Sequence, residues 1–224
     1  MLLDDASGLA DVTARSGAAV LVPLRAWRHE HRAEVMALGR LLRGRRFGHA
    51  VYVGRGYGRF APVLGEVTDG VTVAPAGPLD VADACADLAV LVTVLQQRPD
   101  PADVLAEISR VLRPGALAVI GAANILHGAR RGRYGRSGPA VTGSPAVIGG
   151  GRVGHHPDTL MLQLAMSGLT VERLLSVSNL RHPALDRVLP ERVIQAAEYA
   201  LQAVLAPVYF GPSLFFLARK RELD

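Results

Sequence analysis

Residues 86–124, ADLAVLVTVLQQRPDPADVLAEISRVLRPGALAVIGAAN, decide the fold, because they predict a strand, a helix and a second strand in succession. The run 86–95 is apolar enough for a strand that is buried on both faces. The helix begins after Asp100-Pro101 and ends before Pro114-Gly115. One face of this helix is apolar, with Val104, Leu105, Ile108, Val111 and Leu112. Alternating strands and helices with short connections predict a parallel sheet that helices cover on both faces.

Upstream, the run AVYVGRGYGR (50–59) predicts a strand that opens into a turn with three glycines, Gly54, Gly56 and Gly58. RFAPVLGEV (59–67) then predicts a helix start, and VTVAP (71–75) a short second strand. Before the first strand, residues 24–46 have apolar residues at helical spacing with basic residues between them, which predicts an amphipathic helix. We therefore expect an N-terminal helical segment, 1–46, followed by an α/β domain, 47–224.

The second half of the chain begins with residues 127–156, which are rich in Gly, Arg, Ser and Pro and predict a long loop. After the loop, the pattern predicts a helix, a strand, a second helix and a closing strand: 157–169, 170–180, 189–205 and 212–220.

Composition limits the classes of function. The chain has 224 residues, 50% of them hydrophobic, which is enough to bury a sizeable core. A formal charge of +5 permits an anionic partner, but such a mild excess is more typical of a soluble chain than of a nucleic-acid-binding protein. Cys85 is the only cysteine, and no apolar run approaches the length that spans a membrane. We expect a soluble, cytoplasmic protein in which Cys85 is a buried small residue.

The glycine-rich turn, the stretch 86–124 and the closing SLFFLARK (213–220), in this order, resemble the class I S-adenosylmethionine-dependent methyltransferases of the type 11 kind. The resemblance covers residues 47–220, and its most specific part is PDPADVLAEISRVLRPGALAVI (99–120). It implies a doubly wound, mostly parallel Rossmann-like sheet of seven strands, the last of which is antiparallel. In the family, a carboxylate at the end of the second strand binds both ribose hydroxyls, and an acid after the third strand binds the adenine.

Applied to this chain, the resemblance assigns the cofactor S-adenosylmethionine to Gly54, Gly56 and Gly58. Tyr52 stands where the family has an acid for the methionine amine. Arg55 and Tyr57 occupy two further positions of the turn, at which the family usually has small residues.

Only 28 residues separate Gly58 from Asp87, so one βα unit is missing from the expected pattern. Pro75 aligns with the adenine-site acid and has no side-chain acceptor. Asp69, Asp80 and Asp83 are the local carboxylates, and we take Asp69 and Asp83 as the candidates for cofactor contacts.

On the substrate side, His156 matches a His-Pro that caps the following helix in the family, and Asn124 follows a strand at the edge where ligands bind. Both are candidates for catalysis, His156 as a general base or a cap. The pair His29 and His31 has a spacing unsuited to chelation, so we expect no metal site there.

Two functions remain open. In the first, the cofactor site is eroded, and the protein is a pseudoenzyme that acts as a partner subunit, a binding module or a repurposed small-molecule site. In the second, the protein is an active methyltransferase of a small molecule. The expected partners are a homologous or identical subunit, docked through the apolar helix near 193–210, and a small-molecule ligand, with neither a membrane nor nucleic acid.

Overall fold

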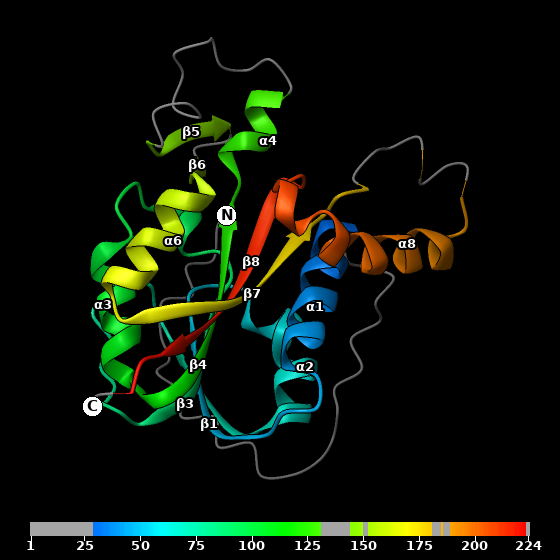
Figure 1. Ribbon diagram of the computed structural model, residues 1–224. Coiled ribbons are helices and arrows are strands. Elements are labelled where there is room, and N and C mark those ends of the chain that lie inside the picture. Colours follow the sequence, from blue (N-terminus) through cyan, green and yellow to red (C-terminus); the bar gives the residue numbers. More distant parts are fainter. Residues whose placement is uncertain (1–28, 131–143, 150–151, 181–184, 186–188, 223–224) are drawn as a thin grey trace, which may run out of the picture.

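The computed structural model describes residues 29–130, 144–149, 152–180, 185 and 189–222. In this part of the chain, a six-stranded sheet has the order β2-β1-β3-β4-β8-β7 (Figure 1). Its strands, in chain order, are β1 (Phe47–Val53), β2 (Thr68–Ala74), β3 (Ala86–Leu91), β4 (Leu112–Ala123), β7 (Leu169–Val177) and β8 (Ser213–Lys220).

Strand directions confirm the predicted fold class. β1 pairs in parallel with β2 and β3, and β3 pairs in parallel with β4. β8 lies antiparallel between β4 and β7. Residues 75–85 run from β2 directly to β3 with no helix or strand between them, so the missing βα unit is confirmed. β2 is therefore an edge strand of the sheet.

Helices cover both faces of the sheet, which completes the doubly wound architecture. One face carries α1 (His29–Leu42), α2 (Tyr57–Val67) and α8 (Glu191–Val204), while α3 (Ala102–Val111) and α6 (Pro157–Met166) lie on the other (Figure 1). Since α1 packs against both α2 and α8, the predicted amphipathic helix is an integral layer of the fold.

The core consists of two hydrophobic clusters, one on each face of the sheet. Along β1, Val51 and Val53 belong to the cluster under α3 and α6, whereas Ala50 and Tyr52 belong to the cluster under α1 and α2. This alternation follows from the two-residue period of a strand. Strands buried on both faces read as continuous apolar runs, which explains why residues 86–91 decide the fold so clearly.

A network from α3 fixes the connection that replaces the missing unit. Arg110 donates to the carbonyl oxygens of Leu79 (3.0 Å) and Val81 (2.8 Å), and it forms ion pairs with Glu107 and Asp83. The backbone N–H of Leu79 in turn donates to Glu107 Oε2 at 3.1 Å. Two adjacent turns of α3 thus hold the shortened connection in place.

The region expected to be a long loop contains regular structure in its described parts. α4 (Ile125–Arg130) follows β4, and β5 (Ala146–Gly149) pairs with β6 (Arg152–Gly154) in an antiparallel hairpin. Residues 131–143 and 150–151 lie outside the described residues. The hairpin was missed because its strands are short and surrounded by glycine, which weakens the alternation that predicts a strand.

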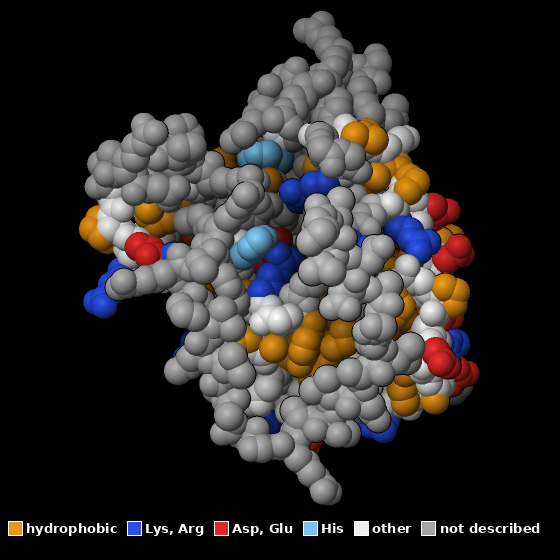
Figure 2. Space-filling model, turned by 180° about the vertical axis from the view of Figure 1, so that it is seen from behind, with side chains coloured by type: hydrophobic (Ala, Val, Ile, Leu, Met, Phe, Trp, Pro, Cys, Tyr) orange, Lys and Arg blue, Asp and Glu red, His pale blue; other side chains and the backbone are white. Residues whose placement is uncertain are grey.

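On the surface, acidic and basic side chains alternate along one margin of the molecule (Figure 2). This mixture agrees with the small net charge of +5. None of the helices in the described part of the chain is long and apolar enough to cross a membrane.

Candidate functional site

The candidate site lies at the carboxyl ends of β1 and β3, where the strand order reverses. β1 connects outward to β2, whereas β3 connects in the opposite direction to β4. In open α/β sheets, ligands bind in the crevice at this switch point. Residues 54–58, 74–77 and 92–98 lie at this edge of the sheet, and we use the name carboxyl-edge crevice for this set of residues.

The glycine turn follows β1 at this edge of the sheet. Gly54 and Gly56 have φ angles of 104° and 89°, which L-residues with a side chain rarely adopt. A Cβ at Gly54 would also lie 2.7 Å from Val94 Cγ2, so the turn packs directly on the segment after β3. Gly58 lies inside α2, where a Cβ would meet nothing within 4 Å. The first two glycines are thus required by the turn itself, whether or not a ligand binds.

Tyr52 supports the turn from the side of α1 and α2. Its side chain is fully buried, and its hydroxyl donates to the carbonyl oxygen of Arg55 at 2.9 Å. The ring contacts those of Tyr57 and Phe60, at centroid distances of 5.5 and 5.9 Å. Burial raises the pKa of Tyr52 to about 12, with Arg59 opposing this shift and Glu34 adding to it. The structure gives Tyr52 a packing role in place of the family's acid.

If this chain followed the family's pattern, the end of β2 would carry the carboxylate that binds the ribose hydroxyls. β2 ends at Ala74 and is followed directly by Pro75. The sequence aligned Pro75 with the adenine-site acid. In the structure, Pro75 occupies the ribose position. The next residue, Ala76, accepts a 3.0 Å hydrogen bond at its carbonyl oxygen from the guanidinium of Arg98. A cation therefore lies beside the strand end at which the family holds an anion.

The two candidate aspartates lie elsewhere. Asp69 is at the amino end of β2, where Thr68 pairs with Phe47, and is five residues before Ala74. At about 3.3 Å per residue, Asp69 therefore lies about 16 Å from the edge of the sheet that carries the glycine turn. Asp83 is mostly exposed and forms an ion pair with Arg110. The structure does not bring Asp69 to the glycine turn, and it ties Asp83 to α3.

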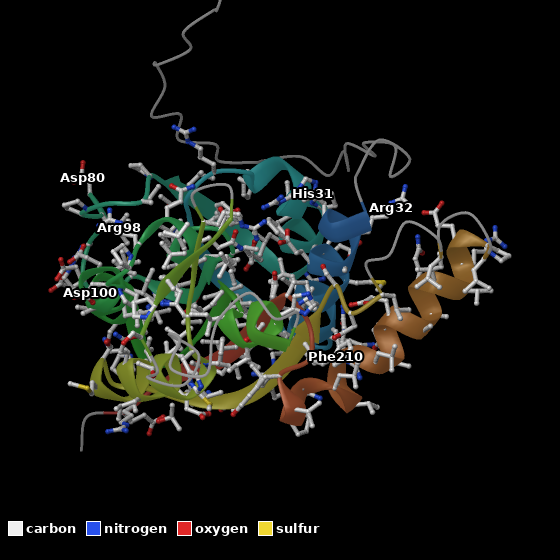
Figure 3. All side chains as sticks on the ribbon, turned by 90° about the horizontal axis from the view of Figure 1, so that it is seen from above. His31, Arg32, Asp80, Arg98, Asp100 and Phe210 are labelled. Atoms are coloured by element: carbon white, nitrogen blue, oxygen red, sulfur yellow. The ribbon has the colours of Figure 1, made fainter. Side chains whose placement is uncertain are left out.

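Asp80, the third local carboxylate, is exposed on the connection between β2 and β3. Seen from above, Asp80, Arg98 and Asp100 lie along the same side of the molecule (Figure 3).

Sequence reasoning missed one acid, Glu34 of α1. It is 3% exposed, and its Oε2 lies 3.6 Å from Arg59 Nη2 on α2. The Arg59 guanidinium in turn lies 3.3–3.4 Å from the place of a Cβ on Gly56. An ion pair thus flanks the glycine turn on the side of the N-terminal helix. Only three-dimensional packing reveals this, since Glu34 precedes the turn by twenty residues and belongs to no recognisable motif.

The substrate-side candidates are brought together around Tyr209. Asn124 is buried, and its Nδ2 donates to the carbonyl oxygens of Tyr209 (2.7 Å) and Gly211 (2.8 Å). The Tyr209 hydroxyl donates to Asp158 Oδ1 at 2.9 Å, and His156 Nδ1 lies 3.9 Å from Asp158 Oδ2. Burial, with Asp158 adding to the effect, raises the pKa of Tyr209. Because both amide hydrogens of Asn124 bind backbone, Asn124 acts in the structure as a clamp on the Tyr209–Gly211 turn.

His156 occupies the N-cap position of α6, as the sequence predicted, but its side chain makes no capping hydrogen bond. Its neighbour His155 is buried and bonds the carbonyl oxygen of Leu95 through Nε2 at 2.8 Å. Burial lowers the pKa of His155, so the neutral ring is favoured. Within the described residues, no group of three or more His, Cys, Asp and Glu side chains is arranged to hold a metal ion.

Taken together, the described residues of the carboxyl-edge crevice keep one part of the family's pattern and depart from it in another. The turn and its φ angles are present, yet the end of β2 offers proline, alanine and an arginine where two ribose hydroxyls need an acceptor.

Comparisons with known proteins agree with the fold. A family model described as a methyltransferase domain matches residues 64–120, from α2 into β4. Curated protein sequences give no match.

Three solved structures share the fold at low sequence identity. A Listeria monocytogenes protein named as an S-adenosylmethionine-dependent methyltransferase has a TM-score of 0.58 and 12% identity, over 86% of this chain and 98% of its own. A Thermotoga maritima protein named as a SAM-dependent methyltransferase has a TM-score of 0.55 and 18% identity, over 85% and 91%. The [4+2]-cyclase SpnF has a TM-score of 0.51 and 15% identity, over 86% and 81%. The matched methyltransferase domain and the strand order support the resemblance to the class I S-adenosylmethionine-dependent methyltransferases, whose fold this chain shares.

Proposed function

We propose that this protein is a non-methylating member of its family, whose S-adenosylmethionine site is eroded and which acts by binding a partner subunit or a small molecule. The observation that carries the proposal is the end of β2. Pro75 and Ala76 stand at the ribose position, and Arg98 donates to the Ala76 carbonyl oxygen there.

The loss of the ribose carboxylate has a large expected effect on affinity. A hydrogen bond to a charged group contributes about 1.5–3 kcal/mol, and two such bonds are missing. Since about 1.4 kcal/mol is a factor of ten, the expected weakening is about a hundredfold or more. A micromolar site would become submillimolar or weaker, which is too weak to support methyl transfer at ordinary cofactor concentrations.

The fold itself does not require methyl transfer, because unrelated activities occur on one fold. SpnF, which shares this fold, is named for a [4+2] cyclisation. A small-molecule site that no longer transfers a methyl group is therefore a reasonable use of the carboxyl-edge crevice in this chain.

The test is titration calorimetry of the purified protein with S-adenosylmethionine and with S-adenosylhomocysteine, each up to millimolar concentration. We expect no binding heat and no thermal shift with either compound. Micromolar binding that is lost in Gly56→Ala, whose φ of 89° disfavours alanine, would overturn the proposal. Gly65→Ala in α2, which meets nothing within 4 Å, is the matched control.

The second candidate function, an active small-molecule methyltransferase, is favoured by the Glu34–Arg59 pair. Arg59, beside Gly56, is suited to the methionine carboxylate, and Glu34, paired with Arg59, is suited to the methionine ammonium. The amino-acid end of the cofactor would thus have partners of both signs. His156, oriented by Asp158, would then be the group for proton removal from an acceptor.

This alternative predicts micromolar S-adenosylmethionine binding that Glu34→Gln weakens. Glu66→Gln, an exposed acid of α2, is the control that should bind like the wild type. Methyl release from labelled cofactor would then be measured on small-molecule acceptors.

A partner subunit is proposed because α8 exposes large apolar side chains and buries two polar ones. It buries Glu198 and Gln202, while Val193 and Val204 are 49% and 69% exposed. Beyond the helix, Phe210 is 42% exposed. We expect light scattering to detect an assembly that Val204→Glu dissociates, and a monomer at all concentrations would contradict this part of the proposal.

A further inference from the structure

A groove lies on the outer face of the molecule, where α1 runs between α2 and α8 (Figure 1). Its volume is about 370 Å³, which is in the range of small-molecule sites. Val35, Met36 and Gly39 of α1 line it together with Val63 of α2 and Tyr199 of α8. This α1 groove is separate from the carboxyl-edge crevice, because none of the residues 54–58, 74–77 or 92–98 lines it.

Gly39 gives the groove its depth. Glycine in a helix interior destabilises the helix by about 1 kcal/mol relative to alanine, so its presence there calls for a reason. Close packing does not explain the glycine, because a Cβ at Gly39 would meet only the Val63 methyl groups, at 3.9 and 4.0 Å. Backbone strain does not explain it either, since Gly39 has no positive φ angle. What the missing side chain does provide is an open floor between α2 and α8.

The charges around the groove all have one sign. Its lining includes three arginines, Arg32, Arg40 and Arg43, and no Asp or Glu. Arg32 forms an ion pair with Glu191 at the start of α8. Two positive charges therefore remain at the groove after this neutralisation.

Arg40 and Arg43 differ in how they are held. The Arg40 guanidinium stacks over the Tyr199 ring, 4.4 Å from its centroid, and donates to the Tyr199 carbonyl oxygen. It is therefore fixed in position beside the apolar floor. Arg43, one turn further along α1, is exposed and makes no ion pair with any described residue.

We propose that the α1 groove binds an amphipathic carboxylate, a small molecule with a hydrocarbon body and one anionic end. The hydrocarbon lies on Val35, Met36 and Val63, where it removes apolar surface from water. The carboxylate meets the guanidinium groups of Arg40 and Arg43, which form charge-assisted hydrogen bonds with it. The inference is independent of the proposed function.

Calorimetry with decanoate, and with decanol as its uncharged counterpart, tests the proposal on the full-length protein. We expect decanoate to bind about fivefold more tightly than decanol, as an exposed ion pair allows. Arg43→Gln should reduce this preference, whereas Arg192→Gln, an exposed arginine of α8 outside the groove, should leave it unchanged.

Gly39→Leu fills the floor and should abolish decanoate binding. Gly39→Ala checks that folding is intact, because its methyl group makes only ordinary contacts and increases helix propensity. Gly65→Leu, a helix glycine of α2 with nothing within 4 Å, should bind decanoate like the wild type.

Three results would overturn the proposal. Equal affinity for decanoate and decanol would remove the role of the arginines, and unchanged binding in Gly39→Leu would place the ligand elsewhere. A dimer that Gly39→Leu dissociates in the absence of any ligand would show that a second copy of the chain covers the groove.

Discussion

The guanidinium of Arg98 donates a 3.0 Å hydrogen bond to the carbonyl oxygen of Ala76, directly after the end of β2. Arg98 follows a 3-10 turn, Leu95–Gln97, whose first carbonyl oxygen binds the ring of buried His155. The shortened β2 end is thereby connected, through residues 95–98, to the segment that follows β6. These contacts stabilise the end of β2, next to the place of the missing βα unit.

Arg98→Ala should therefore loosen the β2 end without affecting the rest of the core. We expect a loss of about 1.5–3 kcal/mol in the free energy of unfolding, since one hydrogen bond from a charged donor is removed. Urea denaturation measures this loss, and hydrogen exchange should accelerate at residues 76–79. Arg192→Ala, an exposed arginine on α8, is the control. Unaltered exchange at 76–79 would show that Arg98 does not hold this turn.

Glu107 should make stability depend on pH in the acid range. The Arg110 hydrogen bond, followed by the N–H of Leu79, lowers the pKa of the Glu107 carboxyl. A carboxyl with a depressed pKa in the folded state stabilises the protein above its unfolded pKa, and this contribution is lost as pH falls through the folded pKa.

Glu107→Gln should thus lower Tm by about 2–4 °C near neutral pH and by much less near pH 3. Calorimetric scans at both pH values measure the difference, with Glu66→Gln as the control for an exposed acid. A Tm difference of the same size at both pH values would contradict a role for the Glu107 charge.

The fold was predictable because its decisive elements carry local signals. Residues 86–91 and 112–123 are apolar on both faces, and α3 has a marked start at Asp100-Pro101. Asp100 Oδ1 accepts the N–H of Ala102 at 3.0 Å, which forms an Asx turn just before the helix. The missing βα unit followed from the short spacing, 28 residues, between Gly58 and Asp87.

The site was less predictable, since it depends on register and on contacts between distant segments. β2 begins three residues before the predicted strand 71–75 and so contains Asp69, but the pairing of Thr68 with Phe47 puts Asp69 at the amino end of the strand, away from the glycine turn. No sequence period reveals which end of a strand meets a turn elsewhere in the chain. Likewise, the approach of Glu34 to Arg59 depends on how α1 packs on α2.

The stability of an Asn124→Ala variant tests whether Asn124 has a structural or a catalytic role. Asn124→Ala removes two donors and leaves the buried carbonyl oxygens of Tyr209 and Gly211 without this partner. We expect the free energy of unfolding to fall by about 2–4 kcal/mol, at about 1–2 kcal/mol for each bond. Urea denaturation measures the fall. A variant of wild-type stability would show that Asn124 is not needed for the turn, and its catalytic assignment would regain support.

Tyr52 should make the stability of the protein depend on pH in the alkaline range. Burial raises the pKa of Tyr52 to about 12, above that of an unfolded tyrosine near 10. Between these two values the folded protein keeps a proton that the unfolded chain releases, so stability falls as pH rises through this window. Tyr52→Phe removes the proton and the bond to the Arg55 carbonyl oxygen.

At about pH 8, Tyr52→Phe should be less stable than the wild type by about 1 kcal/mol, the contribution of one buried hydrogen bond. This deficit should shrink toward about pH 11, because only the wild type retains the proton linkage. Urea denaturation at the two pH values gives the difference, and tyrosinate absorbance follows the ionisation directly. Tyr199→Phe, at a half-exposed position, is the control. Ionisation of Tyr52 at the ordinary tyrosine pKa would mean that water reaches the ring, and the turn at Gly54 would then be open enough to admit a ligand.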